Sequence, residues 1–384
     1  MAASPPGLTA APGPLISRTA PAPVSSRGRG SRLLALDGLR LVAALMVCLY
    51  HYAGRGGTVS ASWHGSPAHL FPSLSRAAVY GNFGVQFFFV ISGFVICMSS
   101  WGRTPGDFLR SRVARLYPAY WVALFLVTGA SLALPVVVHP VRLDEFLVNL
   151  TMLQQPMGAT RVLGVCWTLW VEVRFYVLFA LLVVLRGVNH RRVVLFACIW
   201  TVAAVLCRSS GNDLLNQVVM PDYAPFFIGG LALYLVHRFG SDLLAWGIVG
   251  MSWLLAQSEA TRGLWHPHPH RDPYVVLLIV TVAFAAVAAV ALGWARWASW
   301  SWLATAGALT YPFYLVHEHL GWFVIRVLHR GLGLPAWPTL VVTVLGMLVL
   351  AWLIHRFVER PLGPRLKRAL KARKLASSSP RRGF

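Results

Sequence analysis

The chain has 384 residues, of which 57% are hydrophobic and only 12% are charged. Apolar runs long enough to cross a bilayer recur along its whole length, which excludes a soluble globular domain. The formal net charge of +22 would suggest nucleic-acid binding in a soluble protein. Because no stacking aromatic residues accompany the basic clusters, we favour contact with a membrane surface and expect no nucleic-acid partner.

Apolar segments predict an all-α, polytopic membrane bundle of about ten transmembrane helices. In lipid a helix satisfies its own backbone hydrogen bonds, and the even alternation of barrel strands is absent from the sequence. Two segments are short, so a count one lower or one higher is also compatible. The segments are 33–53, 82–101, 113–134, 165–185, 193–208, 224–239, 243–257, 274–292, 303–327 and 338–357.

The basic residues are distributed unevenly between the two sides of the predicted bundle. With a cytoplasmic N-terminus, about 23 Lys and Arg fall inside and about 9 outside, which predicts that both termini are cytoplasmic. Residues 1–32, rich in Pro, Ala, Ser and Arg, are expected to form a disordered cytoplasmic arm. Residues 33–362 would form the membrane domain, and residues 363–384 a basic cytoplasmic tail against anionic lipid headgroups.

The first apolar segment contains three ionisable side chains, Asp37, Arg40 and His51. Eleven residues are almost three helical turns, so Arg40 and His51 should share one helix face, about 16 Å apart along the axis. Ionisable groups inside a membrane helix are costly unless they face a polar interior. The pattern therefore predicts a buried polar site. The alternative is that Asp37 and Arg40 mark the entrance of the helix and His51 its exit.

The second and third segments indicate helix packing and anion binding. Gly84, Ser92 and Gly93 in the second segment would let another helix approach closely. Arg112 and Arg115 begin the third segment and are neighbours on a helix face at its cytoplasmic end. Two guanidinium groups there can hold phosphate groups by bidentate hydrogen bonds. Considered alone, the pair is more simply interpreted as positive-inside anchors.

Two later segments also carry ionisable residues. Glu172 and Arg174 in the fourth segment are two residues apart, so they should point to different sides of the helix and not pair. Glu172 is therefore either a site residue or a structural partner of Arg40. In the ninth segment His317 is followed directly by a glutamate and a second histidine.

The sequence contains no motif of a soluble hydrolase, a phosphate-binding loop or a zinc peptidase. The outer-loop run His266-Pro-His-Pro-His270 has the look of a metal-binding tract. Its intervening prolines and the lack of acidic or thiol ligands argue against a metal site, so no metal is expected.

The order of these motifs resembles the acyltransferase 3 family of integral membrane O-acyltransferases. Each motif is weak alone, but their order and spacing are specific, and together they cover about residues 33–361. The motifs are Leu36-Asp-Gly-Leu-Arg40 with His51, Gly84-Val-Gln-Phe-Phe-Phe-Val-Ile-Ser-Gly-Phe94, Arg112-x-x-Arg115-x-x-Pro118, Trp167-x-Leu-x-x-Glu172-x-x-Phe-Tyr176 and Tyr314-Leu-Val-His317. The chain departs from the family pattern at Gln86, where an aspartate is usual, and at Thr168, where a serine is usual.

The resemblance implies a multi-pass enzyme of the cell membrane that moves an acetyl, propionyl or similar group from acyl-CoA, its co-substrate, to a hydroxyl. The family's first-helix arginine and histidine correspond to Arg40 and His51, its paired arginines to Arg112 and Arg115, and its glutamate to Glu172. The segments around His51 and Glu172 look closest to macrolide O-acyltransferases of antibiotic biosynthesis. A macrolide or other sugar or polyketide hydroxyl is therefore the first expectation for the acceptor, and cell-envelope polysaccharide the second.

Acyl transfer requires a base, a bound thioester and a group that stabilises the tetrahedral oxyanion. His51 is the expected base because an imidazole titrates near neutral pH, although a covalent acyl-histidine is an alternative. Arg40 would guide the pantetheine arm or stabilise the oxyanion. Glu172 would orient His51 or balance Arg40, and the residues leave this choice open.

The remaining candidates concern the two substrates. Arg112 and Arg115 would hold the coenzyme A phosphates at the cytoplasmic end, and His317 and Asp37 are expected to line the substrate site. In this topology His51 lies towards the outer end of its helix, far from cytoplasmic coenzyme A. Either the acyl arm threads deep into the bundle, or a polar cavity reaches inwards to His51.

Two other functions would also be compatible with buried ionisable groups and many membrane-spanning segments. A small-molecule transporter is the first, but the two halves of the chain show no internal repeat. A regulatory or scaffolding protein, in which charged residues only hold helices together, is the second. Selective binding of coenzyme A, if measured, would favour the enzyme over the transporter. A variant with His51 replaced that folds but no longer turns over substrate would favour the enzyme over the scaffold.

Overall fold

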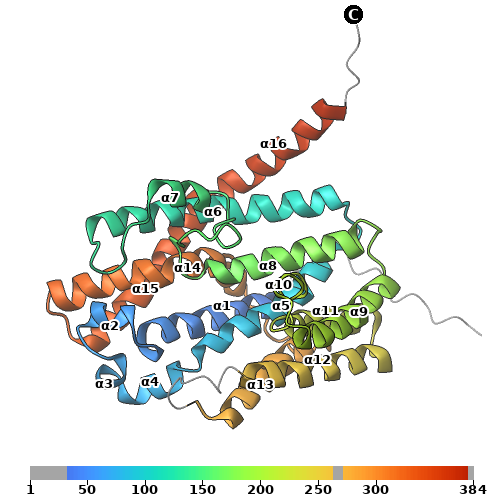
Figure 1. The fold of residues 1–384 in the computed structure, drawn as a ribbon, viewed down its shortest axis with the longest axis horizontal. Helices are drawn as coiled ribbons and strands as arrows, with labels where there is room; N and C mark the ends of the chain where they lie inside the picture. The colour runs from blue at the N-terminus through green and yellow to red at the C-terminus, as the bar shows by residue number, and fades with distance from the viewer. Residues whose placement is uncertain (1–32, 263–270, 379–384) are drawn as a thin grey trace, which may run out of the picture. The chain divides into compact units, whose positions relative to one another are not determined.

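The computed structural model describes residues 33–262 and 271–378, with side chains up to residue 371 (Figure 1). The bundle considered below is the unit that begins at Leu34. Every regular element in these ranges is a helix, and a long helix lies at each predicted segment. The predicted arm, residues 1–32, and the histidine tract, residues 266–270, lie outside the described residues.

The long helices follow the order of the predicted segments, and shorter helices connect them. The long helices are α1 (Leu34–Leu49), α5 (Gly84–Ser100), α6 (Pro105–Ala133), α8 (Cys166–Phe179), α9 (His190–Ser209), α11 (Ala224–Phe239), α12 (Leu243–Arg262), α13 (Pro273–Ala291), α14 (Trp302–Ile325) and α15 (Ala336–Ile354). The shorter ones are α2 (Thr58–Trp63), α3 (Pro67–Leu70), α4 (Pro72–Ala78), α7 (Leu143–Asn149) and α10 (Asp213–Val219).

Eight helical stretches in the described residues are long and apolar enough to cross a membrane. The stretches α12 and α14 are also long, but their sequences are more polar. Most of α14 is buried within the protein, so its polar side chains face other helices and not lipid. The described part of the chain is therefore an all-α polytopic membrane bundle, as predicted. The cytoplasmic placement of both termini stays a prediction from the charge distribution.

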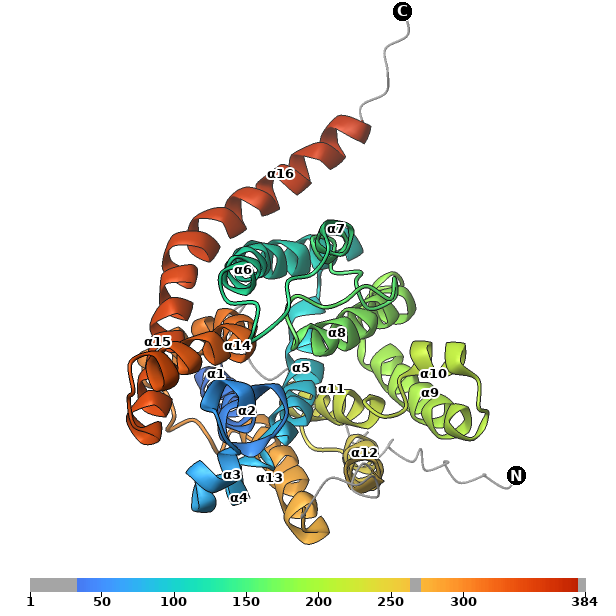
Figure 2. The same ribbon diagram turned by 60° about the vertical axis from the view of Figure 1, so that its left-hand side comes forward.

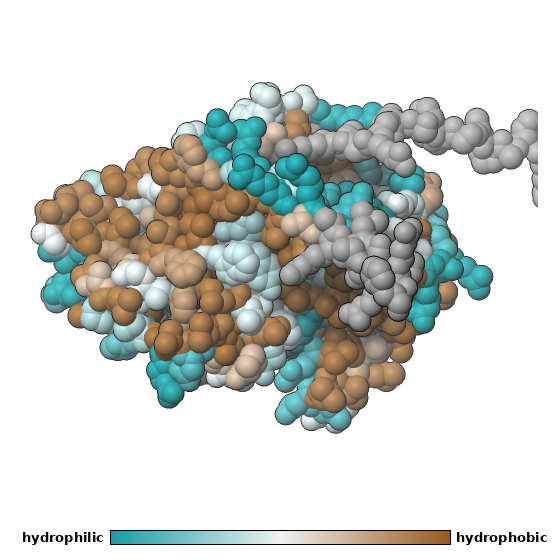
Figure 3. Space-filling model, turned by 90° about the horizontal axis from the view of Figure 1, so that it is seen from above, coloured by the Kyte–Doolittle hydropathy of each residue, from teal (hydrophilic) through white to brown (hydrophobic). Residues whose placement is uncertain are grey.

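Large hydrophobic side chains are exposed on the outer faces of several helices. Examples are Val42 on α1, Phe125 on α6, Ile199 on α9, Leu278 on α13 and Leu345 on α15. Figure 3 shows hydrophobic residues covering much of one face, with hydrophilic residues gathered mainly towards its margins. An apolar surface of this extent is unfavourable in water but matches the hydrocarbon core of a bilayer.

The chain continues from α15 through the π-helical turn η6 (His355–Glu359) into α16 (Arg360–Ser378). Figures 1 and 2 show α16 running on from the bundle beyond α6. Its exposed basic residues, Arg365, Lys367, Arg368 and Lys371, belong to the predicted basic tail. The first part of that tail is therefore helical. Its position against anionic lipid stays a prediction.

The interior is organised around α1, which packs against α5 and α14, while α5 packs in turn against α11 (Figure 2). Two glycines of α5 permit these close crossings. A methyl group at Gly93 would overlap the carbonyl oxygen of Phe227 on α11, and one at Gly84 would overlap that of Ala43 on α1. Close helix approach at both glycines confirms the prediction made from the small residues of the second segment.

We expect Gly93→Ala to destabilise the bundle, because the added methyl group forces α5 and α11 apart. Overpacking of this kind costs about 1–3 kcal/mol. The matched control is Gly129→Ala on α6, where a methyl group meets open space. Thermal melting of the detergent-solubilised proteins should give a lower Tm for Gly93→Ala alone. Equal melting of the two variants would contradict this packing.

Candidate active site

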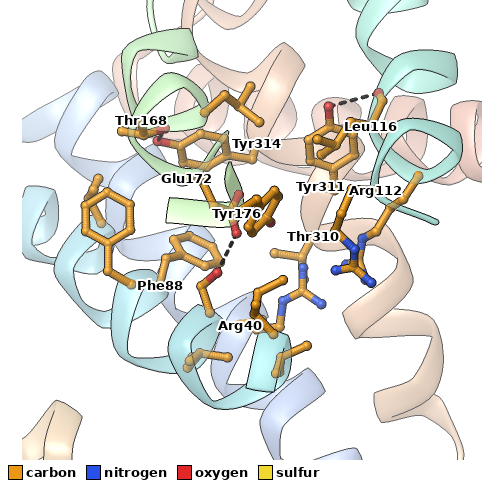
Figure 4. Close-up of a pocket in the computed structure, with 18 residues that line it drawn as sticks. Arg40, Phe88, Arg112, Leu116, Thr168, Glu172, Tyr176, Thr310, Tyr311 and Tyr314 are labelled. Atoms are coloured by element: carbon orange, nitrogen blue, oxygen red, sulfur yellow. Dashed lines mark hydrogen bonds between the residues drawn. The ribbon is translucent and has the colours of Figure 1, made fainter. Parts of the chain in front are cut away.

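A first cavity, which we call the arginine cavity, lies among α1, α5, α6, α8 and α14. Protein atoms leave about 760 Å³ of space unfilled there. Its polar lining is formed by Arg40 from α1, Arg112 and Arg115 from α6, and Glu172 and Tyr176 from α8. Figure 4 shows Arg112 on one side of this cavity and Tyr314, Thr168 and Phe88 on the opposite side.

The arginine cavity carries an excess of positive charge. Arg40 and Arg112 are half-buried, Arg115 is exposed, and Glu172 is the one carboxylate in the lining. Glu172 accepts a hydrogen bond of 2.6 Å from Ser92 on α5. The three guanidinium groups of the lining outnumber its single carboxylate. A cavity with several such arginines is suited to an anionic ligand.

A second cavity, which we call the histidine cavity, adjoins the first and leaves about 1200 Å³ unfilled. Its lining contains His51, Arg55, Gln86, Glu318 and His319. His51 belongs to η1 (Tyr50–Gly54), a π-helical turn that continues α1. Such turns are rare in proteins as a whole, and those that occur are often found at functional sites.

The ring nitrogens of His51 have different environments, and His317 determines which one carries the proton. His317 Nδ1 lies 2.9 Å from the carbonyl oxygen of Tyr314, which can only accept, so this nitrogen is protonated. Neutral His317 is then an acceptor at Nε2, which lies 3.0 Å from His51 Nδ1. His51 Nδ1 must therefore donate. This leaves the Nε2 lone pair of neutral His51 available to accept a proton.

Glu318 faces the basic nitrogen of His51. Its Oε1 lies 3.3 Å from His51 Nε2 and 3.4 Å from the guanidinium of Arg55. Glu318 is only 5% exposed, and its other oxygen, Oε2, is buried without a hydrogen-bond partner in the described protein. Gly164 makes room for this carboxylate, since a methyl group there would overlap it. A buried carboxylate beside Nε2 stabilises the imidazolium that forms when His51 takes a proton.

Further polar atoms are buried at the histidine cavity without a partner in the described protein. They are Oδ1 of Asn82 and Oε1 of Gln86, and both residues line the cavity. Trp167 and Trp322 add aromatic surface to the same lining. Buried polar atoms are costly unless a ligand or water satisfies them. The cavity therefore offers hydrogen bonds and flat apolar faces to a polar organic molecule.

The structure places some predicted site residues differently from the expectation. Arg40 and His51, expected in one site, line different cavities. Glu172 lies with the arginines and bonds Ser92, so of its two predicted roles the structure favours charge balance near Arg40. The acidic neighbour of His51 is Glu318 instead.

The two residues expected to line the substrate site do not line either cavity. His317 is completely buried, and its Nε2 lies 3.0 Å from Nδ1 of His51. Asp37 is buried on α1 against Gly307 of α14. Arg174 points away from both cavities and donates to the carbonyl oxygen of Gln217, as its spacing from Glu172 predicts.

Glu318 and Arg55 were not identified as site residues from the sequence. Glu318 had a usable signal, because a carboxylate between two histidines inside an apolar segment needs a polar partner. Arg55 had none, since it follows the first segment directly and resembles an ordinary interfacial arginine.

Comparison with known proteins assigns the chain to a family. Residues 33–356 match the profile of the acyltransferase 3 family, which describes an acyltransferase domain. The chain therefore belongs to this family, and it is a membrane-embedded enzyme that transfers acyl groups. No solved structure matches it significantly.

Two curated proteins are similar over most of their own length. Acyltransferase MdmB of Streptomyces mycarofaciens is 26% identical over 374 residues, covering 86% of this chain and 91% of MdmB. Exopolysaccharide production protein ExoZ of Rhizobium meliloti (strain 1021) is 28% identical over 324 residues, covering 77% of this chain and 93% of ExoZ. The part shared with Protein 2 in picA locus of Rhizobium radiobacter is shorter, at 33% identity over 127 residues.

We expect His317→Leu to lower kcat, because His51 Nδ1–H loses its acceptor and the ring can adopt the wrong tautomer. The loss should be about 100-fold or more, the usual scale of general-base catalysis. His317→Gln, which can present an acceptor oxygen to His51, should recover part of that loss. Steady-state kinetics should show the change in kcat with little change in KM for the acyl donor. Equal kcat values for the Leu and Gln variants, with equal melting temperatures, would contradict the tautomer role.

Proposed function

We propose that this protein is an O-acyltransferase of the cell membrane that moves an acyl group from acyl-CoA to a hydroxyl of a macrolide or another sugar or polyketide acceptor. The observation that carries the proposal is the orientation of His51. Its Nδ1 donates to His317, which leaves a lone pair on Nε2, and His51 lines a cavity able to hold a polar organic molecule, directly beside a second cavity lined by arginines. These features supply the base and the anion site that the reaction requires.

The reaction begins when His51 Nε2 accepts the proton of the acceptor hydroxyl. The resulting oxygen nucleophile attacks the thioester carbonyl, forming the new C–O bond and a tetrahedral oxyanion. Glu318 stabilises the His51 imidazolium during this step. When the C–S bond breaks, His51 returns its proton to the departing thiolate of coenzyme A, so the enzyme is regenerated.

Arg55 is placed to stabilise the oxyanion, a role that the sequence suggested for Arg40. The Arg55 guanidinium lies 3.4 Å from Glu318 Oε1 and 5.6 Å from the ring centroid of Trp322, in the same cavity as His51. Arg40 instead lines the arginine cavity, so in this proposal it contacts the donor before the acyl group reaches His51.

Acyl-CoA is the proposed donor because its phosphates match the charge of the arginine cavity. Arg112 lies on the side of that cavity opposite Tyr314 (Figure 4), while the acyl end must reach His51 beyond Tyr314. Arg40 and His51 are eleven residues apart, about 16 Å of helix, which suits a donor with a long flexible arm. Of the two routes that the sequence left open, we therefore favour threading of the acyl arm into the bundle.

Cell-envelope polysaccharide is the second candidate for the acceptor. Similarity to ExoZ over most of its length favours it, because that relative is named for exopolysaccharide production. Similarity to MdmB, named simply as an acyltransferase, is compatible with either acceptor.

The proposal is tested by offering purified protein radiolabelled acetyl-, propionyl- and butyryl-CoA, with a panel of macrolides in one assay and with cell-wall glycans in another. We expect label on a macrolide hydroxyl with the wild type and none with a folded His51→Ala variant, which lacks the base. Equal label with the variant would remove His51 from the mechanism. Label on cell-wall glycans alone would replace the macrolide with the polysaccharide acceptor.

Arg112→Ala and Arg115→Ala should each raise KM for acyl-CoA by about 10-fold or more, because each removes charge-assisted hydrogen bonds to phosphate worth about 1.5–3 kcal/mol. The matched control is Arg110→Ala on the same helix, whose guanidinium already pairs with Asp107 at 2.9 Å and does not line the cavity. Initial rates over a range of acyl-CoA concentrations measure the effect. The same KM change in all three variants would show that the effect comes from general positive surface charge and not from phosphate binding by Arg112 and Arg115.

A further inference from the structure

The arginine and histidine cavities have only two lining residues in common, Val85 of α5 and Tyr314 of α14. No charged residue lines both cavities. The arginine cavity alone contains Arg40, Arg112, Arg115 and Glu172, and the histidine cavity alone contains His51, Arg55 and Glu318. An acyl group that enters with its coenzyme A in the arginine cavity must therefore pass Val85 and Tyr314 to reach His51.

The side chain of Tyr314 is held across this passage by one neutral hydrogen bond. Its hydroxyl lies 2.9 Å from Oγ1 of Thr168 on α8. Thr168 uses its only hydroxyl proton to donate to the carbonyl oxygen of Val165 at 2.8 Å, so the Tyr314 hydroxyl is the donor to Thr168. Phe88 supports the tyrosine ring edge-on, with the ring centroids 5.6 Å apart. Figure 4 shows these three side chains together at one side of the arginine cavity.

Movement of the Tyr314 ring leaves the hydrogen bonds of His317 intact, although the two rings are neighbours with their centroids 5.5 Å apart. The Tyr314 carbonyl that fixes His317 belongs to the backbone of α14 and stays in place when the side chain rotates. A single neutral hydrogen bond changes an equilibrium by roughly fivefold to tenfold, so losing the bond to Thr168 weakens the hold on a ring that is otherwise kept in place by burial and by its contact with Phe88. The residue therefore combines a fixed carbonyl with a movable ring.

We propose that Tyr314, held by Thr168, forms together with Val85 a barrier between the two cavities that selects which acyl chains reach His51. This proposal rests on the proposed function. A short acyl group needs little displacement of the ring, whereas each added methylene must pass between the ring and the branched side chain of Val85. Acyl-chain preference is then set at the passage, and not only in the cavity where the reaction occurs.

The test compares kcat/KM for butyryl-CoA with kcat/KM for acetyl-CoA. Val85→Ala widens the passage, and Tyr314→Phe keeps the ring but removes its bond to Thr168. Each should raise the butyryl-to-acetyl ratio about tenfold or more, the scale on which a methylene is discriminated. Val85→Phe should lower the ratio to a similar extent. The matched control is Val95→Ala, which lines only the arginine cavity and should leave the ratio unchanged.

Binding of non-reactive analogues, in which a ketone replaces the thioester of acetyl- and butyryl-CoA, supplies a readout independent of turnover. Calorimetry should show that Val85→Ala and Tyr314→Phe bind the butyryl analogue more tightly relative to the acetyl analogue than the wild type does. An unchanged kcat/KM ratio in either variant, with acetyl transfer retained, overturns the barrier and leaves the proposed function standing. A wild type that neither binds the analogues nor transfers an acyl group overturns both.

Discussion

The hydrogen bond from His317 Nδ1 to the carbonyl oxygen of Tyr314 determines the state of the site around it. Because a carbonyl can only accept, this bond fixes the tautomer of His317, which in turn fixes the donor nitrogen of His51. The basic Nε2 of His51 is thereby turned towards Glu318 and the cavity. In the proposed mechanism neutral His317 orients the base His51, so His317 takes the position that a carboxylate holds in a serine-protease triad.

The polar residues inside the bundle form two groups, one in each cavity, and the two groups differ in the chemistry they can perform. Three arginines and one glutamate line the cavity where the proposed mechanism places the anion, and His51, Glu318 and Arg55 lie together where it places proton transfer. Low-dielectric surroundings strengthen the attraction between opposite charges, such as an anion and the half-buried Arg40 or the carboxylate of Glu318 and Arg55, because buried charges are screened less than exposed ones. The close crossings of α1 with α5 and α14 bring the two groups side by side.

Much of the fold and part of the site could be predicted from the sequence. The apolar segments fixed the helices because their lengths match a bilayer, and Arg40, His51, Arg112, Arg115 and Glu172 all line one of the two cavities. The partner of His51 could not be assigned, since Glu172 and Glu318 are both single carboxylates in apolar helices. Only the packing of α14 on α1 distinguishes them. The presence of two cavities was equally inaccessible, because the two residues that line both of them, Val85 and Tyr314, are uncharged and carry no signal in an apolar segment.

The π-helical turn η1 at His51 has a consequence for how this chain can vary in length. Such a turn holds one more residue than an α-helical turn, so removing one residue from it would restore regular α-helix without breaking the span. Because the turn absorbs its extra residue locally, the helix before it would keep its rotation, and the change would fall on the residues of the turn itself. Arg40 would keep its place, but His51, which belongs to the turn, would lose its present orientation. A deletion that is harmless to insertion in the membrane would therefore act on the histidine cavity and leave the arginine cavity as it is, whereas the same deletion in the middle of α1 would rotate all the residues that follow.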